Sequence, residues 1–240
     1  MRSRGHEAIE REVPLPDRRF GRQRAFVAGA VLLAAFTLLA VPVELSWSPL
    51  EKLDAGFARH LDAWVTSDSV RVDTASVLSD WVWDPFVFRG LVLVVCVWLW
   101  RRGERRTVMW AVVAMAAAAG ASGLMKIAFD RPRPEGMAVT APGGSFPSGH
   151  VVTATVGAGV LVLLLAPALS ARLGLLVRGI ALVSVVGVGA TRAVLGAHYL
   201  TDVVGGWLLG GAILALTCAA FASGRRQELG GKARSPAVRE

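Results

Sequence analysis

Six long apolar stretches alternate with short polar segments along the chain. The first, residues 25–43, runs for 19 residues without a charge, enough to cross a hydrocarbon core of about 30 Å at about 1.5 Å per residue. A cleaved signal peptide would have a shorter apolar core of about 7–15 residues. The other five stretches are 85–100, 107–128, 150–166, 174–191 and 200–222. The pattern predicts an all-α bundle of six transmembrane helices.

Residues 44–84, between the first two spans, follow a different pattern. From Leu50 to Val65, apolar residues recur at helical spacing with charged residues between them, which is typical of an amphipathic helix at a membrane interface. A second short helix is predicted from Val77 to Val82. The pattern fits a packed hairpin outside the membrane equally well, and the sequence leaves both interpretations open.

Composition agrees with one integral membrane domain over residues 25–222, flanked by basic tails at 1–24 and 223–240. Of the 240 residues, 54% are hydrophobic, and the mean hydropathy is +0.52. The two cysteines, Cys96 and Cys218, both lie in apolar stretches and predict no disulfide framework. The net charge of +8 would suit a nucleic-acid partner, but the placement of the charges indicates membrane orientation instead.

With six spans, both termini lie on the same side of the membrane. That side carries 18 Lys and Arg residues, against 8 on the other, so the positive-inside rule places both termini in the cytoplasm. The bias toward Ala, Val, Leu, Gly and Arg, with few Lys, is typical of a GC-rich bacterial genome. We therefore expect a multi-pass protein of the bacterial plasma (inner) membrane.

Polar and ionisable residues gather at the non-cytoplasmic ends of four spans. Such residues at the edges of apolar spans are costly and commonly functional. They are Lys126 and Arg133 after the third span, Ser148, Gly149 and His150 at the start of the fourth, Arg192 at the end of the fifth, and His198 and Asp202 at the start of the sixth. Topology alone therefore predicts that these four helix ends meet.

The residue types in this set suit phosphate chemistry. Arginine forks match phosphate oxygens, and lysine adds a point charge. Ser148 and Gly149 lead directly into the fourth helix, whose N-terminus would offer free N–H groups and the positive end of its dipole. Together these features predict a phosphate cradle.

A catalytic pair is predicted beside this cradle. Asp202 follows His198 by four residues, so in a helix both side chains would share one face. The carboxylate would then hold one imidazole nitrogen and leave the other free as a base or nucleophile. His150 is the second titratable group, suited to protonating a leaving oxygen. No set of metal-ligand type accompanies them, so we expect neither a metal nor a cofactor.

Each of these residues alone has an ordinary structural explanation, such as an anchor to lipid headgroups or a helix start. Their joint order resembles the three motifs of the type 2 phosphatidic acid phosphatase superfamily, which also contains the vanadium haloperoxidases. The motifs are Lys, six residues, Arg-Pro (126–134), Pro-Ser-Gly-His (147–150), and Ser-Arg, five residues, His, three residues, Asp (191–202). The chain departs from this pattern only at Thr191, where the family has Ser.

The resemblance implies a metal-independent phosphohydrolase of lipid phosphates, an acid phosphatase of phosphoric monoesters or diphosphates. It makes His198 the nucleophile that forms a phosphohistidine, Asp202 its orienting partner, and His150 the acid and then the base. It makes the phosphate binders Lys126, Arg133, Ser148, Gly149 and Arg192. Thr191 is the weakest assignment. Arg131 is extra to the motif, and we expect it either to contact the headgroup or to be simply exposed.

Several functions stay open at this point. Substrate classes include phosphatidate, phosphatidylglycerophosphate and polyprenyl mono- or diphosphates. A lipid phosphotransferase differs only in whether an alcohol replaces water. A haloperoxidase is disfavoured by the six spans, and a non-catalytic lipid-binding or transport protein by the intact pair of His198 and Asp202 and the absence of internal repeats. The sequence predicts no oligomeric state.

Overall fold

The computed structural model describes residues 21–134 and 143–222, and within these ranges the chain is helical with no strand. Six helical segments are long and apolar enough to cross a membrane, which confirms the predicted all-α six-span architecture. The α-helices are α2 (Arg22–Glu44), α3 (Ser48–Thr66), α4 (Ser69–Val77), α5 (Pro85–Arg101), α6 (Arg105–Phe129), α7 (Gly149–Leu165), α8 (Ala171–Val194) and α9 (Leu200–Ala222). A π-helical turn, Leu78–Val82, joins α4 to α5, and a 3₁₀ turn, Ala166–Ala168, follows α7.

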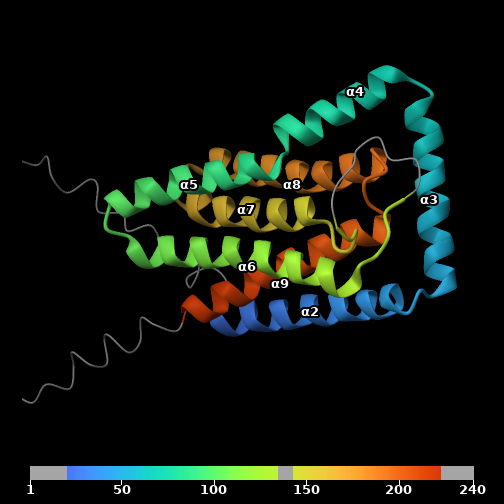
Figure 1. Cartoon of the computed structure of the whole chain (residues 1–240). Helices are drawn as coiled ribbons and strands as arrows, with labels where there is room; N and C mark the ends of the chain where they lie inside the picture. Colours follow the sequence, from blue (N-terminus) through green and yellow to red (C-terminus); the bar gives the residue numbers. More distant parts are fainter. Residues whose placement is uncertain (1–20, 135–142, 223–240) are drawn as a thin grey trace, which may run out of the picture.

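The long helices run roughly along one axis, with α7 at the centre (Figure 1). Helices α5, α6, α8 and α9 pack around α7, and α2 packs along α9. The outward faces remain apolar: Leu38, Leu93 and Leu182 are 77%, 63% and 65% exposed. Such wide apolar exposure on all sides suits a hydrocarbon environment and would be unusual for a protein in water.

Glycines allow α7 and α9 to approach closely. A Cβ atom added to Gly210 would lie 2.8 Å from the Cβ atom of Thr155, and one added to Gly159 would lie 2.2 Å from a methyl carbon of Leu214. Small residues at membrane helix interfaces permit such close backbone approach. The polar N-terminal ends of α7 and α9 are therefore held side by side.

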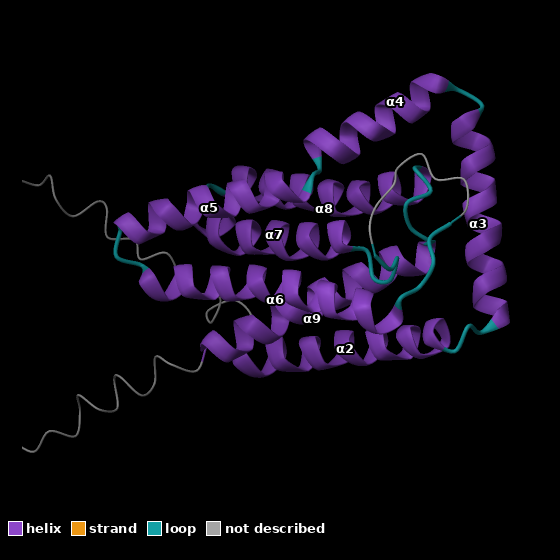
Figure 2. Ribbon diagram, in the orientation of Figure 1, coloured by secondary structure: helices purple, strands orange, loops and turns teal. Residues whose placement is uncertain are grey.

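Helix α3 runs across one end of the bundle, nearly perpendicular to the other long helices, and α4 leads back toward α5 (Figure 2). The predicted amphipathic helix is α3, and it has the orientation that the interfacial interpretation predicts. The second short helix was predicted at Val77–Val82, whereas the second α-helix, α4, spans Ser69–Val77 and is continued by the π-helical turn Leu78–Val82. Only Asp54 and Val65 are buried in α3. The predicted tails lie almost wholly outside the described residues, as does the middle of the predicted loop 129–149.

Candidate active site

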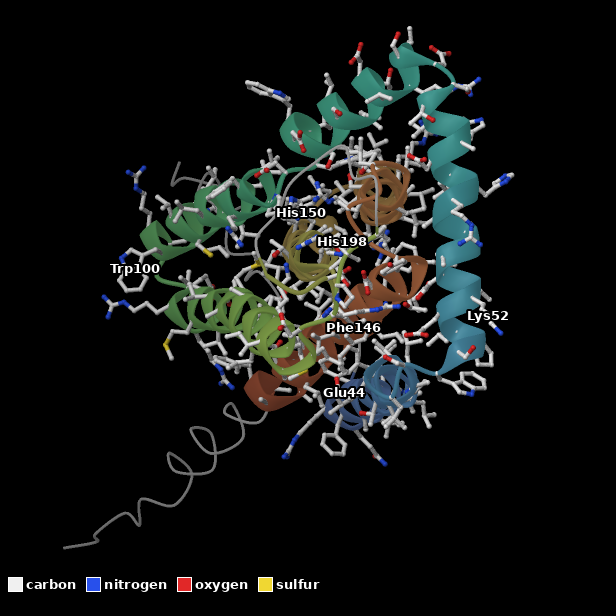
Figure 3. The ribbon with its side chains drawn as sticks, turned by 45° about the vertical axis from the view of Figure 1, so that its right-hand side comes forward. Glu44, Lys52, Trp100, Phe146, His150 and His198 are labelled. Atoms are coloured by element: carbon white, nitrogen blue, oxygen red, sulfur yellow. The ribbon has the colours of Figure 1, made fainter. Side chains whose placement is uncertain are left out.

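The predicted site residues come together at the end of the bundle that α3 crosses. Figure 3 shows His150 and His198 close to one another at this end, whereas Trp100 marks the opposite end. His150 interacts electrostatically with His198 and with three cations, Lys126, Arg133 and Arg192. Four helix ends from distant parts of the sequence therefore share one polar site.

His198 faces the carboxylate of Asp202 in the interior of the protein. The Nδ1 atom of His198 lies 3.4 Å from Oδ2 of Asp202, and the two residues are 2% and 0% exposed. The same oxygen accepts a 2.9 Å hydrogen bond from the amide of Tyr199. His198 precedes α9, which begins at Leu200, so the pair is formed by the turn before the helix and not along a helix face.

The surroundings keep His198 neutral near pH 7. Burial lowers the pKa of His198 to about 4, even though its contact with Asp202 acts in the opposite direction. With Nδ1 facing the carboxylate, Nε2 is the nitrogen that carries a lone pair. Nε2 lies 3.4 Å from Nη1 of Arg133, so in this tautomer its lone pair accepts a long hydrogen bond from a cationic side chain.

Arg133 is held at this position by backbone carbonyls on two loops. Its Nη1 atom donates to the oxygen of Ala197 at 2.7 Å, and Nη2 donates to that of Gly144 at 3.5 Å. Burial lowers the pKa of the Arg133 guanidinium, and the charge of Asp202 offsets part of this effect. Arg133 thus brings a fixed positive charge beside Nε2 of His198.

The N-terminus of α7 supplies the next part of the site. Ser148 precedes the helix and is fully buried, and Gly149 is its first residue. A Cβ atom added to Gly149 would lie 3.0 Å from Oγ of Ser122 and 3.8 Å from Nζ of Lys126. The Lys126 ammonium therefore lies beside a helix N-terminus, a combination suited to an anion.

Arg192 completes the cationic set from the end of α8. It is only 3% exposed, its Nη1 atom donates to Oγ of Ser79 at 3.1 Å, and Oδ1 of Asp80 lies 3.9 Å away. Both partners belong to the π-helical turn before α5, and π-helical turns are frequent at functional sites. Sequence analysis missed Ser79 and Asp80, because nothing in the local pattern pairs them with Arg192.

Four buried polar atoms in this site make no hydrogen bond of normal geometry among the described residues: Nε of Arg133, Oγ of Ser148, Nε of Arg192, and Nδ1 of His198, which faces Oδ2 of Asp202 at 3.4 Å as an ion-pair contact. Buried polar atoms are nearly always paired in folded proteins. Donors on two guanidinium groups and a hydroxyl, next to a lysine and a helix N-terminus, match the oxygens of a tetrahedral anion. Chemically, the arrangement is able to hold a phosphoryl group in front of Nε2 of His198.

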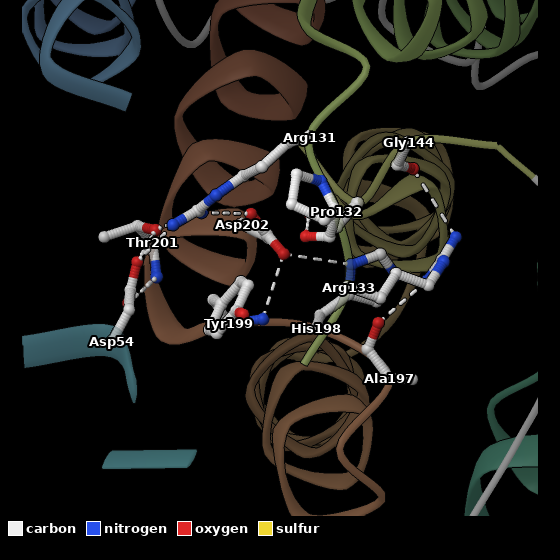
Figure 4. Close-up of polar contacts among 11 residues, drawn as sticks. Asp54, Arg131, Pro132, Arg133, Gly144, Ala197, His198, Tyr199, Thr201 and Asp202 are labelled. Atoms are coloured by element: carbon white, nitrogen blue, oxygen red, sulfur yellow. Dashed lines mark hydrogen bonds and ion pairs between the residues drawn. The ribbon is translucent and has the colours of Figure 1, made fainter. Parts of the chain in front are cut away.

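Arg131 was expected either to contact a headgroup or to be simply exposed. The expectation of exposure is wrong, and the contact with a headgroup stays a prediction. Its side chain is 11% exposed and forms ion pairs with two carboxylates (Figure 4). Nη1 lies 2.7 Å from Oδ1 of Asp202, and Nη2 lies 2.8 Å from Oδ2 of Asp54. Burial acts to lower the pKa of Arg131, but the charges of Asp202 and Asp54 outweigh it and raise the pKa.

Sequence analysis also missed Asp54, although one signal was present. Asp54 lies four residues after Leu50 and three before Phe57, and it therefore falls on the apolar stripe of the amphipathic helix. The side chain is 1% exposed. Thr191, the weakest assignment, donates its hydroxyl to the carbonyls of Gly187 and Val188 in its own helix.

The described residues contain no group of three His, Cys, Asp or Glu side chains that could hold a metal ion. The expectation that the chemistry requires no metal stays a prediction. The roles that the sequence assigns to His198, Asp202 and His150 are predictions too. The geometry described above supports them.

Comparison with known proteins agrees with the fold. The PAP2 superfamily profile matches residues 107–225, and no curated protein sequence matches the chain. Among solved structures, the chain is similar to "the first transmembrane PAP2 type phosphatidylglycerolphosphate phosphatase from Bacillus subtilis". The TM-score is 0.67 at 21% identity, over 88% of this chain and 99% of that one, and a likeness at this identity shows a shared fold.

Proposed function

The chain belongs to the PAP2 superfamily, and from this membership and the site geometry we propose that it is an integral membrane lipid phosphate phosphohydrolase. The observation that carries the proposal is the buried pair of His198 and Asp202, with the lone pair of Nε2 facing Arg133 at 3.4 Å. A neutral imidazole held by a carboxylate is a nucleophile, and the cations around it suit a phosphoryl group.

The first step of the proposed reaction forms a phosphohistidine. Nε2 of His198 attacks phosphorus, the bond to the lipid oxygen breaks, and protonated His150 gives its proton to the leaving oxygen. Asp202 stabilises the imidazolium charge that develops on His198. The donors of Arg133, Arg192, Lys126 and Ser148 stabilise the charge on the three equatorial phosphoryl oxygens.

The second step returns the enzyme to its starting state. Water attacks the phosphohistidine while His150, now neutral, takes the water proton. The bond between phosphorus and Nε2 breaks, and inorganic phosphate leaves. No step in this scheme uses a metal ion.

A lipid substrate is supported by the surroundings of the site. Two helix ends that form the site also border an apolar pocket of about 230 Å³, lined by Phe57 and Leu61 of α3, Ala193 of α8, and Leu200 and Val203 of α9. Leu200 and Val203 belong to the same turn as Asp202, so an acyl or prenyl chain in this pocket would lie next to the reacting phosphate. We propose phosphatidate, phosphatidylglycerophosphate or a polyprenyl phosphate as the substrate class.

We propose further that the site faces away from the cytoplasm of a bacterial cell, with both termini inside, as the charge asymmetry indicates. Lys52 on α3 and Arg102, which directly follows α5, are both exposed. Lys52 and Trp100, near the end of α5, lie at opposite ends of the bundle (Figure 3). A membrane-impermeant maleimide should therefore label Lys52→Cys in intact cells and Arg102→Cys only after lysis. The reverse pattern would contradict the proposed orientation.

The function is tested by phosphate release from purified protein in detergent with excess EDTA. Phosphatidate, phosphatidylglycerophosphate and a polyprenyl diphosphate are compared, with His198→Ala as the control. Release that survives EDTA and disappears in the variant supports the proposal, and the ranking of the three lipids identifies the substrate class. Activity that EDTA abolishes, or that His198→Ala retains, would contradict it.

A phosphotransferase of the same superfamily is the alternative, because the phosphohistidine would be identical and only the acceptor would differ. Adding an alcohol such as glycerol during turnover separates the two. A hydrolase releases inorganic phosphate as the main product, whereas a transferase yields the new phosphoester and releases phosphate slowly without the acceptor.

A further inference from the structure

The most buried side chain of α3 is charged. Asp54 is 1% exposed, whereas the apolar neighbours on the same helix, Leu53 and Phe57, are 54% and 37% exposed. A helix that rests on a bundle normally buries its apolar residues and leaves its carboxylates in water. Burial of Asp54 therefore requires strong compensating partners.

These partners lie at the start of α9 and on the loop after α6. Oδ1 of Asp54 accepts a 3.1 Å hydrogen bond from the amide of Thr201, and Oδ2 accepts hydrogen bonds from the Thr201 hydroxyl and, at 2.8 Å, from Nη2 of Arg131. Asp54 thus stabilises the N-terminus of α9, where free N–H groups and the helix dipole favour a carboxylate. It does so from a helix 147 residues away in sequence.

Arg131 is shared between Asp54 and Asp202, and this sharing decides which atoms of Asp202 remain free. With Nη2 held by Asp54, only Nη1 reaches Asp202, at Oδ1. Oδ2 of Asp202 then faces Nδ1 of His198 and accepts from the amide of Tyr199. An arginine paired with one carboxylate alone prefers the two-bond arrangement that uses both carboxylate oxygens.

We propose that Asp54 is a positioning residue for the reaction. It holds Arg131 so that the guanidinium makes one hydrogen bond to Asp202, at Oδ1. Oδ2 of Asp202 is then left to face the imidazole of His198. This inference rests on the proposed function, in which His198 is the nucleophile. The amphipathic helix α3 is then part of the catalytic apparatus and more than a covering for the bundle.

The test compares Asp54→Asn with Asp62→Asn, the same change at an exposed position of α3. Loss of the Asp54 charge frees Nη2 of Arg131 to approach Oδ2 of Asp202 and draws that oxygen away from His198. We expect kcat for phosphate release to fall by about 10–100-fold, the range seen when an outer-shell partner is removed. KM and product inhibition by inorganic phosphate should change less than about twofold, because the phosphate donors do not contact Asp54. Asp62→Asn should match the wild type.

A double-mutant cycle separates positioning from general support of the fold. Arg131→Lys keeps the charge, but a point charge bridges two carboxylates poorly, and we expect a similar loss of kcat. If Asp54 acts through Arg131, combining both changes should cost little more than Arg131→Lys alone. If Asp54→Asn does not fold, Thr201→Val provides the second variant, because it removes the hydroxyl that accepts from Nη1 of Arg131 at 2.8 Å and donates to Oδ2 of Asp54. The direct ion pair between Asp54 and Arg131 remains, so we expect a smaller loss of kcat with KM unchanged, and a rise in KM without a loss of kcat would contradict positioning.

Two results would overturn the inference while leaving the proposed function intact. One is normal kcat in Asp54→Asn beside an inactive His198→Ala. The other is a double-mutant cycle in which the effects of Asp54→Asn and Arg131→Lys on activity simply add, and in which Asp54→Asn raises KM by as large a factor as it lowers kcat. A wild-type protein without phosphatase activity, or an active His198→Ala, would instead overturn the proposed function and this inference with it.

Discussion

The backbone amide of Ser148 donates a 3.0 Å hydrogen bond to the carbonyl oxygen of Asp202. This bond joins the residue before α7 to the first turn of α9, and so ties the predicted phosphate cradle to the carboxylate that faces His198. The two helices therefore direct their N-termini, the positive ends of their dipoles, toward the same site. This contact fixes the proposed phosphate donor Ser148 relative to Asp202, the proposed partner of the nucleophile.

Gly206 keeps this contact close. A Cβ atom added there would lie 2.8 Å from the Cβ atom of Val151 and 3.1 Å from the carbonyl oxygen of Ser148. Gly206→Ala should therefore push the start of α7 away from α9, with at least a tenfold loss of kcat/KM and a lower unfolding temperature in detergent. Gly211→Ala on the same helix is the control, because its Cβ would meet only the flexible end of Leu32, at 3.1 Å. Equal activity in the two variants would show that the contact is not needed.

Most of the fold was predictable because a hydrocarbon core requires every backbone polar group to be paired within a helix. Each span must then be one uninterrupted apolar stretch, which the sequence displays directly. The stretch predicted at 107–128 became α6 at Arg105–Phe129, and 200–222 became α9 with the same bounds. The differences are confined to helix ends, where polar residues continue a helix beyond its apolar part.

The partners of the site residues were not predictable in the same way. Asp54 pairs with Arg131 across 77 residues of sequence, and Arg192 pairs with Ser79 across 113. The rules for helix spacing apply to neighbours within one helix and give no pairing between distant segments. A single charged residue on an amphipathic helix or on a loop is most often solvated. Asp54 on α3 and Arg131 on the loop after α6 are instead buried against each other.

Gly149 should keep space for an anion open between the Lys126 ammonium and the N-terminus of α7. In Gly149→Ala the added methyl group would lie 3.0 Å from Oγ of Ser122, which must shift, and 3.6 Å from Cε of Lys126, an ordinary contact. The methyl group would therefore fill the space between the Lys126 side chain and the N-terminus of α7. We expect KM to rise about tenfold or more, as phosphate binding weakens. The control is Gly120→Ala on α6, where a Cβ atom would meet nothing within 4 Å and where alanine favours the helix by about 1 kcal/mol. Unchanged KM in Gly149→Ala would contradict the placement of Lys126 in the cradle.

The acidic limb of the pH profile should report the nucleophile. Burial lowers the pKa of His198 to about 4, against the upward pull of Asp202, and only the neutral imidazole attacks. The value of kcat/KM should therefore fall as the pH drops through about 4. In Asp202→Asn the upward pull is lost, so this limb should move to lower pH while the maximal rate falls. The wild type and Asp202→Asn are measured on the same substrate, so that the ionisation of the substrate affects both pH profiles equally. An acidic limb that moves to higher pH in Asp202→Asn would refute the contact between His198 and Asp202.

The loss of kcat on removing His150 should be larger for a poorer leaving group. A lipid alkoxide needs a proton as it leaves, whereas an activated aryl phosphate such as p-nitrophenyl phosphate does not. His150→Ala should therefore lower kcat for the lipid by about 10²–10⁴-fold, the usual range for general acid catalysis. With the aryl phosphate, the rapid first release of p-nitrophenol, which accompanies formation of the phosphohistidine, should remain, because this step does not need the acid.

The phosphohistidine should then accumulate in His150→Ala, because His150 is also the base that activates water. Labelled phosphate should therefore be trapped on His198 in this variant. An equal loss for both substrates, with no trapped label, would assign His150 to binding of the phosphate and leave the acid unidentified.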